Sequence, residues 1–228
     1  NENKYPSTNI QMDVFKEQLR VIEEEGITFI HPKDFEKSLS QDKDKRKILL
    51  TIDDGLLSFY KNAWPILKDK KIPFILFVNT REVGSFNYMN WEQILELHKN
   101  KNVEIGNHSH SHEYLVDENP DVIRSDILKS INIFKNNLGK NSDFFSYPFG
   151  EYSLAFKEII KNFGFKYAFG QHSGVIDETK DLLELPRYPI NEKYGEIERF
   201  KTLMKTLPLK YKSIEPKDMY LLQSKNPP

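Results

Sequence analysis

Short apolar runs alternate with amphipathic helical patterns along this chain, and no other sequence feature constrains its fold as strongly. Runs typical of buried strands cover residues 27–30, 47–53, 72–78, 103–107, 144–147, 167–170 and 183–190. Helical patterns cover residues 12–22, 60–67, 90–98, 120–138, 154–163 and 197–207. Asn90 can cap the helix at 90–98, and Gly139 closes the long helix at 120–138. Alternation of this kind predicts a parallel sheet with crossover helices, because each helix returns the chain to the start of the next strand. The expected fold is α/β, either a barrel or a doubly wound sheet.

The composition limits the partners that the protein can have. A chain of 228 residues suits one α/β domain over 1–228, and its net charge of −1 gives no overall field for nucleic acid or an anionic membrane. It has no cysteine, which excludes disulfides and Cys-ligated zinc. No apolar run reaches the ~18 residues of a membrane span. No signal peptide is visible, and because the chain begins at Asn1 without methionine, we expect it to be part of a longer product.

Two adjacent acids stand at the end of the apolar run 47–53: Asp53 is its last residue, and Asp54 follows directly. In parallel α/β folds, functional sites are built at the carboxyl ends of the strands. The two side chains diverge, so one carboxylate can bind a metal while the other stays free to accept a proton. The alternative is an Asp-Gly turn with solvated carboxylates.

Three of the six histidines lie within five residues, directly after the run 103–107. His108 and His112 are four residues apart, so on a helical turn they would share a face and could chelate one ion. Imidazole is a usual ligand of zinc and similar divalent metals. His110 would point elsewhere. A polar loop that happens to be rich in histidine is the alternative.

Three weaker candidates lie after or within predicted strands, and Arg187 belongs to the run 183–190 itself. Residues 146–152 read Ser-Tyr-Pro-Phe-Gly-Glu-Tyr, a turn whose backbone N–H groups could point at a developing oxyanion. His172 could donate a proton to a leaving group, and Arg187 could hold a carboxylate in place. Each candidate has an ordinary interpretation as well: a plain turn, a structural histidine and a surface ion pair.

In this order, the clusters resemble the motifs of the polysaccharide deacetylase family, also called the NodB-homology domain or carbohydrate esterase family 4. Residues 51–55, Thr-Ile-Asp-Asp-Gly, are similar to its Thr-Phe-Asp-Asp-Gly motif. Residues 108–112 match its His-Ser/Thr-x-x-His motif, and residues 147–150 resemble its third motif. The resemblance spans about residues 45–190 and is closest to the branch that acts on exported poly-N-acetylglucosamine.

The resemblance implies a distorted (β/α) barrel and a metal-dependent hydrolase that removes N-acetyl groups from an N-acetylglucosamine-containing polysaccharide, releasing acetate. Asp54, His108 and His112 would hold one divalent ion, zinc first, although cobalt, nickel or iron also suit these ligands. Asp53 would be the general base, and the backbone N–H of Phe149 would stabilise the oxyanion. The family also implies an acetylated glycan as partner and a place outside the cytoplasm: the periplasm, the cell surface or the medium.

Two positions depart from the family pattern. The third motif usually has arginine two residues before its proline, where this chain has Ser146. The fifth motif usually reads Leu-x-His, with histidine as general acid, but the best match here places Arg187 at that position. We therefore predict that His172 serves as the acid and that Arg187 restrains Asp53.

Three other functions stay open on the sequence alone. The same scaffold could hydrolyse an O-acetyl ester or a cyclic amide. The chain could also be a non-catalytic carbohydrate-binding domain, which the two departures from the family pattern allow. The presence of Asp53 argues against this function, because binding alone does not need a base. The third is an intracellular metal-binding domain without a sugar ligand.

Overall fold

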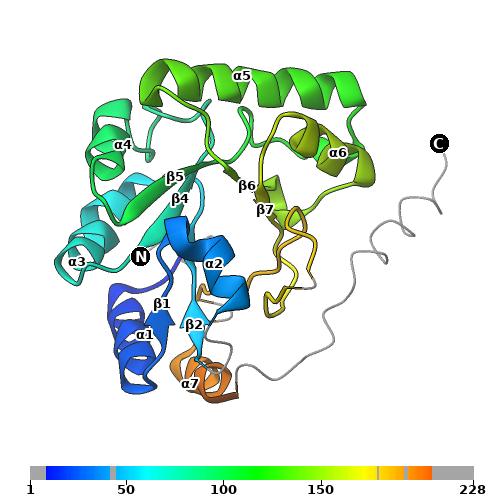
Figure 1. Ribbon diagram of the computed structural model, residues 1–228. Coiled ribbons are helices and arrows are strands. Elements are labelled where there is room, and N and C mark those ends of the chain that lie inside the picture. Colours follow the sequence, from blue (N-terminus) through cyan, green and yellow to red (C-terminus); the bar gives the residue numbers. More distant parts are fainter. Residues whose placement is uncertain (1–8, 42–44, 179, 193–194, 207–228) are drawn as a thin grey trace.

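The computed structural model describes residues 9–41, 45–178, 180–192 and 195–206. Its main sheet has five parallel strands in the order β3-β4-β5-β6-β7, which is also their order along the chain (Figure 1). These strands are β3 (Leu50–Ile52), β4 (Phe74–Val78), β5 (Val103–Asn107), β6 (Phe144–Ser146) and β7 (Tyr167–Phe169). A sequential order belongs to a barrel, since a doubly wound sheet reverses its order at a switch point. The predicted distorted (β/α) barrel is confirmed, as a curled and open parallel sheet.

A second, two-stranded parallel sheet pairs β1 (Thr28–Phe29) with β2 (Lys47–Ile48). The apolar run 47–53 is therefore divided between two sheets, because β3 begins at Leu50 and pairs with β4. Helices α1 (Met12–Glu24) and α7 (Ile197–Thr206) pack on the small sheet through a shared apolar cluster, at the bottom of Figure 1. The last residue of the helix predicted at 197–207 lies outside the described residues.

Four helices connect the strands of the main sheet and cover its outer face: α3 (Trp64–Asp69), α4 (Trp91–His98), α5 (Pro120–Leu138) and α6 (Leu154–Asn162). A π-helical turn, Phe59–Ala63, precedes α3. The predicted cap of α4 is confirmed, since Asn90 accepts from the Gln93 N–H at 2.9 Å. Helix α5 ends where the sequence predicts, because Gly139 adopts φ 77°, which favours glycine.

The inner face of the sheet is filled with side chains. Phe77 and Phe169 point inward with Ile75, and they pack on Phe35 of α2 (Phe35–Ser40). The neighbouring positions on β4 point outward against the helices, as alternation along a strand requires. Because apolar side chains fill this interior, polar groups gather above it, at the carboxyl ends of the strands.

The strand predicted at residues 183–190 is wrong. In the described part of this segment, the only ladder contact is a parallel bridge between Leu185 and Phe169. Pro186 and Pro189 have no N–H to donate, so a regular ladder cannot continue past them. The segment still runs beside β7, which brings Arg187 to the carboxyl edge of the sheet. Among the helices that the structure describes, none is long and apolar enough to cross a membrane.

Candidate active site

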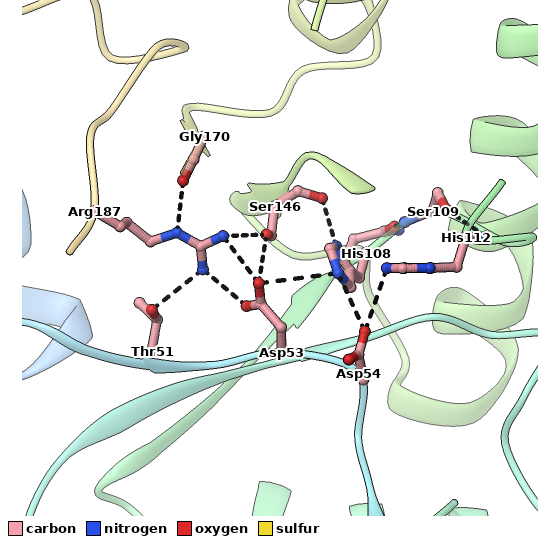
Figure 2. A network of polar contacts seen from close by, with 10 residues as sticks. Thr51, Asp53, Asp54, His108, Ser109, His112, Ser146, Gly170 and Arg187 are labelled. Carbon is pink, nitrogen blue, oxygen red and sulfur yellow. Dashed lines mark hydrogen bonds and ion pairs between the residues drawn. The ribbon is translucent and has the colours of Figure 1, made fainter. Parts of the chain in front are cut away.

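Polar side chains from neighbouring strand ends meet in one network of contacts (Figure 2). Asp53 and Asp54 follow β3, His108 follows β5, and Ser146 ends β6. Asp54 has a positive φ of 74°, so the backbone turns sharply between the two acids. Asp53 therefore points to Arg187 and Asp54 points to the histidines, as Figure 2 shows. The divergence expected from the sequence is present in the structure.

Asp54, His108 and His112 bring three potential metal ligands together. Nε2 of His108 lies 3.5 Å and Nε2 of His112 3.3 Å from Oδ1 of Asp54. Zinc bonds of about 2.0–2.1 Å at tetrahedral angles would separate neighbouring ligand atoms by ~3.3 Å. The trio therefore fits a divalent ion, and three protein ligands leave a tetrahedral ion one position for another molecule.

His108 is oriented as a metal ligand should be. Its Nδ1 lies 2.7 Å from the carbonyl oxygen of Ser146, which can only accept, so Nδ1 carries the proton and Nε2 faces Asp54. Burial is the largest single influence on His108 and opposes its protonation, but Asp54, Asp53 and the Ser146 carbonyl together outweigh burial and raise the pKa of His108. Burial, together with the charge of His108, lowers the pKa of His112. A metal at this site would compete with a proton for His108.

The helical turn expected for the two histidines is wrong, although their rings do meet with centroids 4.7 Å apart. The segment 108–112 is a loop in which Ser109 and His112 adopt positive φ values of 66° and 54°. Five consecutive backbone N–H groups, from Ser109 to Glu113, each donate to a side-chain oxygen. Side chains therefore replace the backbone ladder that a helix would have used.

Helix α5 supplies the long-range part of this support. Oδ1 of Asp126 accepts from the His110 N–H at 2.8 Å, and Oδ2 accepts from the Ser111 N–H at 3.0 Å. Ser130, one turn further on, accepts from the side-chain amide of Asn107 at 3.0 Å, and its hydroxyl oxygen lies 3.1 Å from Oδ1 of the same residue. Neither residue is predicted from the sequence, because an acid and a serine on an amphipathic helix look like ordinary polar positions.

The side chain of His110 points away from the metal ligands, as expected. Its Nδ1 lies 2.8 Å from Oγ1 of Thr80, just after β4. The Thr80 N–H also donates to the Ser109 carbonyl at 3.2 Å. His110 thus ties the histidine loop to the neighbouring strand end.

Arg187 binds Asp53 through two parallel hydrogen bonds, Nη1 to Oδ1 at 2.8 Å and Nη2 to Oδ2 at 2.9 Å. Its other three N–H groups donate to the Gly170 carbonyl at 2.8 Å, to Ser146 Oγ at 3.0 Å and to Thr51 Oγ1 at 3.3 Å. All five guanidinium donors therefore have acceptors, which fixes the side chain in one orientation. The short side chain of Ser146 also donates to Asp53 Oδ2 at 3.3 Å, so the serine joins this pair.

Asp53 is a carboxylate held beside the metal ligands but outside their set. Burial opposes its ionisation, but the charges of Arg187 and His108, together with the hydrogen bonds from Arg187 and Ser146, outweigh burial and lower the pKa of Asp53 to about 2. Its Oδ2 lies 4.0 Å from Nε2 of His108, and its side chain is 20% exposed. Part of this carboxylate therefore faces solvent.

The turn Pro148–Gly150 lies after β6, next to His112. Phe149 adopts a left-handed conformation with φ 59°, and within the described ranges no acceptor contacts its backbone N–H. A Cβ at Gly150 would lie 2.3 Å from Gln171, so only glycine fits there. This N–H is free to donate to a ligand.

His172 is not part of the contact network in Figure 2. Its ring lies 6.4 Å from that of Tyr152, and its buried Nδ1 has no hydrogen-bond partner among the residues described. Burial lowers the pKa of His172, against the opposing charge of Glu184. The role of general acid stays a prediction for this histidine.

A model of the polysaccharide deacetylase family matches residues 40–168, more than half of the chain. The chain therefore belongs to the polysaccharide deacetylase family. The matched range contains every predicted site residue except His172 and Arg187. Those two lie beyond it, in the part of the chain where the sequence departs from the family's fifth motif.

Individual relatives agree with this assignment. The poly-beta-1,6-N-acetyl-D-glucosamine N-deacetylase of Staphylococcus epidermidis is 26% identical over 205 residues, covering 84% of this chain and 69% of that protein. The structure of IcaB from Ammonifex degensii has a TM-score of 0.79 at 25% identity, covering 86% of this chain and 90% of that one. Streptococcus pyogenes deacetylase PplD, solved in complex with acetate, shares the fold with a TM-score of 0.78 at 24% identity, covering 92% and 94%. Family and fold together define an enzyme, a polysaccharide deacetylase.

Proposed function

We propose that this enzyme removes N-acetyl groups from a poly-N-acetylglucosamine and releases acetate, with a divalent metal at Asp54, His108 and His112. The pair of Asp53 and Arg187 is the observation that carries the proposal. A binding domain would need neither a second carboxylate beside the ligand set nor an arginine that keeps it ionised. The named substrate of the Staphylococcus epidermidis relative supports the choice of glycan. Such a polymer is exported, so the enzyme would act outside the cytoplasm.

The three proposed ligands carry one negative charge between them, so a divalent ion would keep most of its Lewis acidity. When bound, the ion supplies that acidity to a water molecule and to the acetyl carbonyl. Zinc is the expected ion, and cobalt, nickel and iron suit the same ligands. The low pKa of Asp53 keeps its carboxylate ionised at neutral pH, the state in which it can accept a proton.

The residues around the ion would carry the remaining steps. Asp53 would accept a proton from the attacking water as its oxygen bonds to the acetyl carbon. The Phe149 N–H would donate to the carbonyl oxygen as that oxygen gains negative charge. The carbon–nitrogen bond then breaks, and a general acid, His172 in our prediction, would protonate the departing amine. The products are acetate and a free amino group on the sugar.

Acetate release tests the proposal directly. Metal-loaded protein is incubated with a short β-1,6-linked N-acetylglucosamine oligomer, with metal-free protein and Asp53→Asn in parallel. We expect metal-dependent acetate from the wild type and a loss of at least ~100-fold in Asp53→Asn, the size of a general-base contribution. Absence of acetate from wild-type protein with metal bound would contradict the proposal. O-acetylated sugars and cyclic amides would be the next substrates, and their failure would favour a carbohydrate-binding domain.

The assignment of the general acid needs its own test. His172→Ala should lower acetate release and remove the basic limb of its pH profile, because the leaving amine would lose its proton donor. Wild-type turnover in His172→Ala would exclude this histidine as the acid.

A further inference from the structure

We propose that Tyr114 and Phe149 form a stacking platform for the sugar unit next to the one that is deacetylated. The identity of this ligand, a pyranose of an N-acetylglucosamine polymer, rests on the proposed function. Tyr114 follows the histidine loop and Phe149 lies in the turn after β6. Their side chains are 43% and 51% exposed, although large aromatic rings are usually buried.

The two rings form one surface that begins at a proposed metal ligand. The ring centroid of Phe149 lies 4.9 Å from that of His112 and 6.0 Å from that of Tyr114. The other large apolar side chains found exposed within the described ranges are Phe86, on a separate loop, and aliphatic residues on α5 and α6. An occupant of the Tyr114–Phe149 surface would therefore lie directly beside the reacting group.

Both residues make contacts of their own before any ligand binds. The Tyr114 hydroxyl donates to Oε2 of Glu151 at 2.5 Å, and this bond raises the pKa of Tyr114 to about 12. Phe149 is held in a left-handed conformation that is unfavourable for any residue with a Cβ. Glycine would offer the same backbone N–H without that strain, so the phenyl ring has a use of its own. A ring that already has such contacts loses less entropy when a ligand binds to it.

A sugar ring suits this surface better than other occupants do. A pyranose with equatorial substituents presents a flat face of C–H groups and a rim of hydroxyls. The aromatic rings can take the face, while the Glu151 carboxylate, already next to Tyr114, can accept from hydroxyls at the rim. A protein or a membrane on the same surface would cover the entrance to Asp54 and His112, whereas a neighbouring sugar of the substrate would direct the chain into it.

Binding and turnover together test the platform. Dissociation constants for a β-1,6-linked N-acetylglucosamine tetramer are measured with metal-loaded Asp53→Asn, with and without Tyr114→Ala. We expect Tyr114→Ala to weaken binding about tenfold, as the loss of one aromatic contact would. In the active enzyme, which keeps Asp53, Tyr114→Ala should lower kcat/KM for the tetramer by raising KM. The effect on the monosaccharide should be smaller. Tyr114→Phe, which keeps the ring, should lose less. Leu154→Ala removes a similarly exposed side chain on α6 and is the control, expected to match the wild type.

The outcomes separate this inference from the proposed function. An unchanged dissociation constant in Tyr114→Ala, or equal losses on tetramer and monosaccharide, would overturn the platform while acetate release by the wild type still stands. Tetramer binding that depends on Tyr114, without acetate from any N-acetylglucosamine oligomer, would support the platform and contradict the deacetylase proposal.

Discussion

The two segments that carry the site keep their shape by different interactions. Asp53 and Asp54 continue β3 directly, and its pairing with β4 places them. The histidine loop 108–112 has already left the sheet, and side-chain oxygens hold its backbone, two of them on Asp126. The acid segment therefore depends on the sheet and on Arg187, whereas the loop depends on a helix that contributes no proposed metal ligand. Substitutions outside the proposed ligands should separate these two kinds of support.

The largest effect is expected within the acid segment, where adjacent carboxylates have different proposed roles. Asp54→Asn removes the only charged ligand, so the protein should lose its metal and at least ~1,000-fold of its activity. Asp53→Asn should keep a full complement of metal despite its loss of turnover. Metal content after dialysis, measured beside acetate release, checks both. Full metal retention in Asp54→Asn would contradict the proposed ligand set.

The next effect concerns the support of the base. Arg187→Gln removes the positive charge that favours the ionised form of Asp53. Burial, which opposes ionisation, then has a larger net effect on this carboxyl. The pKa of Asp53 should rise from about 2, so the acid limb of kcat/KM should move to higher pH. Metal content should not change. Arg187→Lys should keep the positive charge but lose the two parallel hydrogen bonds. We therefore expect it to keep only part of the activity. An acid limb that stays in place would separate Arg187 from the ionisation of Asp53.

A smaller effect is expected from the support of the histidine loop. Asp126→Asn keeps the size of the side chain but can accept only one of the two N–H donors, so the loop should be less well ordered. We expect metal affinity to fall about tenfold, as it does when partners of metal ligands are altered. Asp121→Asn is the matched control, since it makes the same change at a 97% exposed side chain of the same helix. Competition with a chelator measures the affinity, and equal affinities in the two variants would rule out a positioning role for Asp126.

The smallest effect should come from Ser130→Ala. This change removes the buried hydroxyl that pairs with Asn107, and one hydrogen bond contributes about 1 kcal/mol to folding. Chemical denaturation of the metal-free protein measures this loss. Because Asn107 still accepts from the Ser109 N–H, metal affinity should change less than in Asp126→Asn. If Ser130→Ala lost more metal affinity than Asp126→Asn, Ser130 would be the more important support of the histidine loop.

Several site residues could be predicted because local sequence carries their signal. The acids and histidines follow apolar runs, and carboxyl ends of parallel strands meet at one edge of a sheet. Their meeting in the structure is confirmed, as is the contact of Arg187 with Asp53. The path of residues 183–190 and the loop of His108 and His112 were predicted wrongly. In both cases, a regular backbone was expected where proline or positive φ values prevent one.

The sequence by itself determined the alternation of strands and helices, the caps of α4 and α5 and the family, because periodicity, capping and motifs are all local. Only the tertiary structure decided which side chains support the site. Arg187 is 134 residues from Asp53 in the sequence. Asp126 is 16 residues from His110 and 15 from Ser111, the residues whose N–H groups donate to it. Contacts across such separations depend on how a helix packs on the sheet and where a segment passes β7. That packing is set by the whole core, and no local pattern contains it.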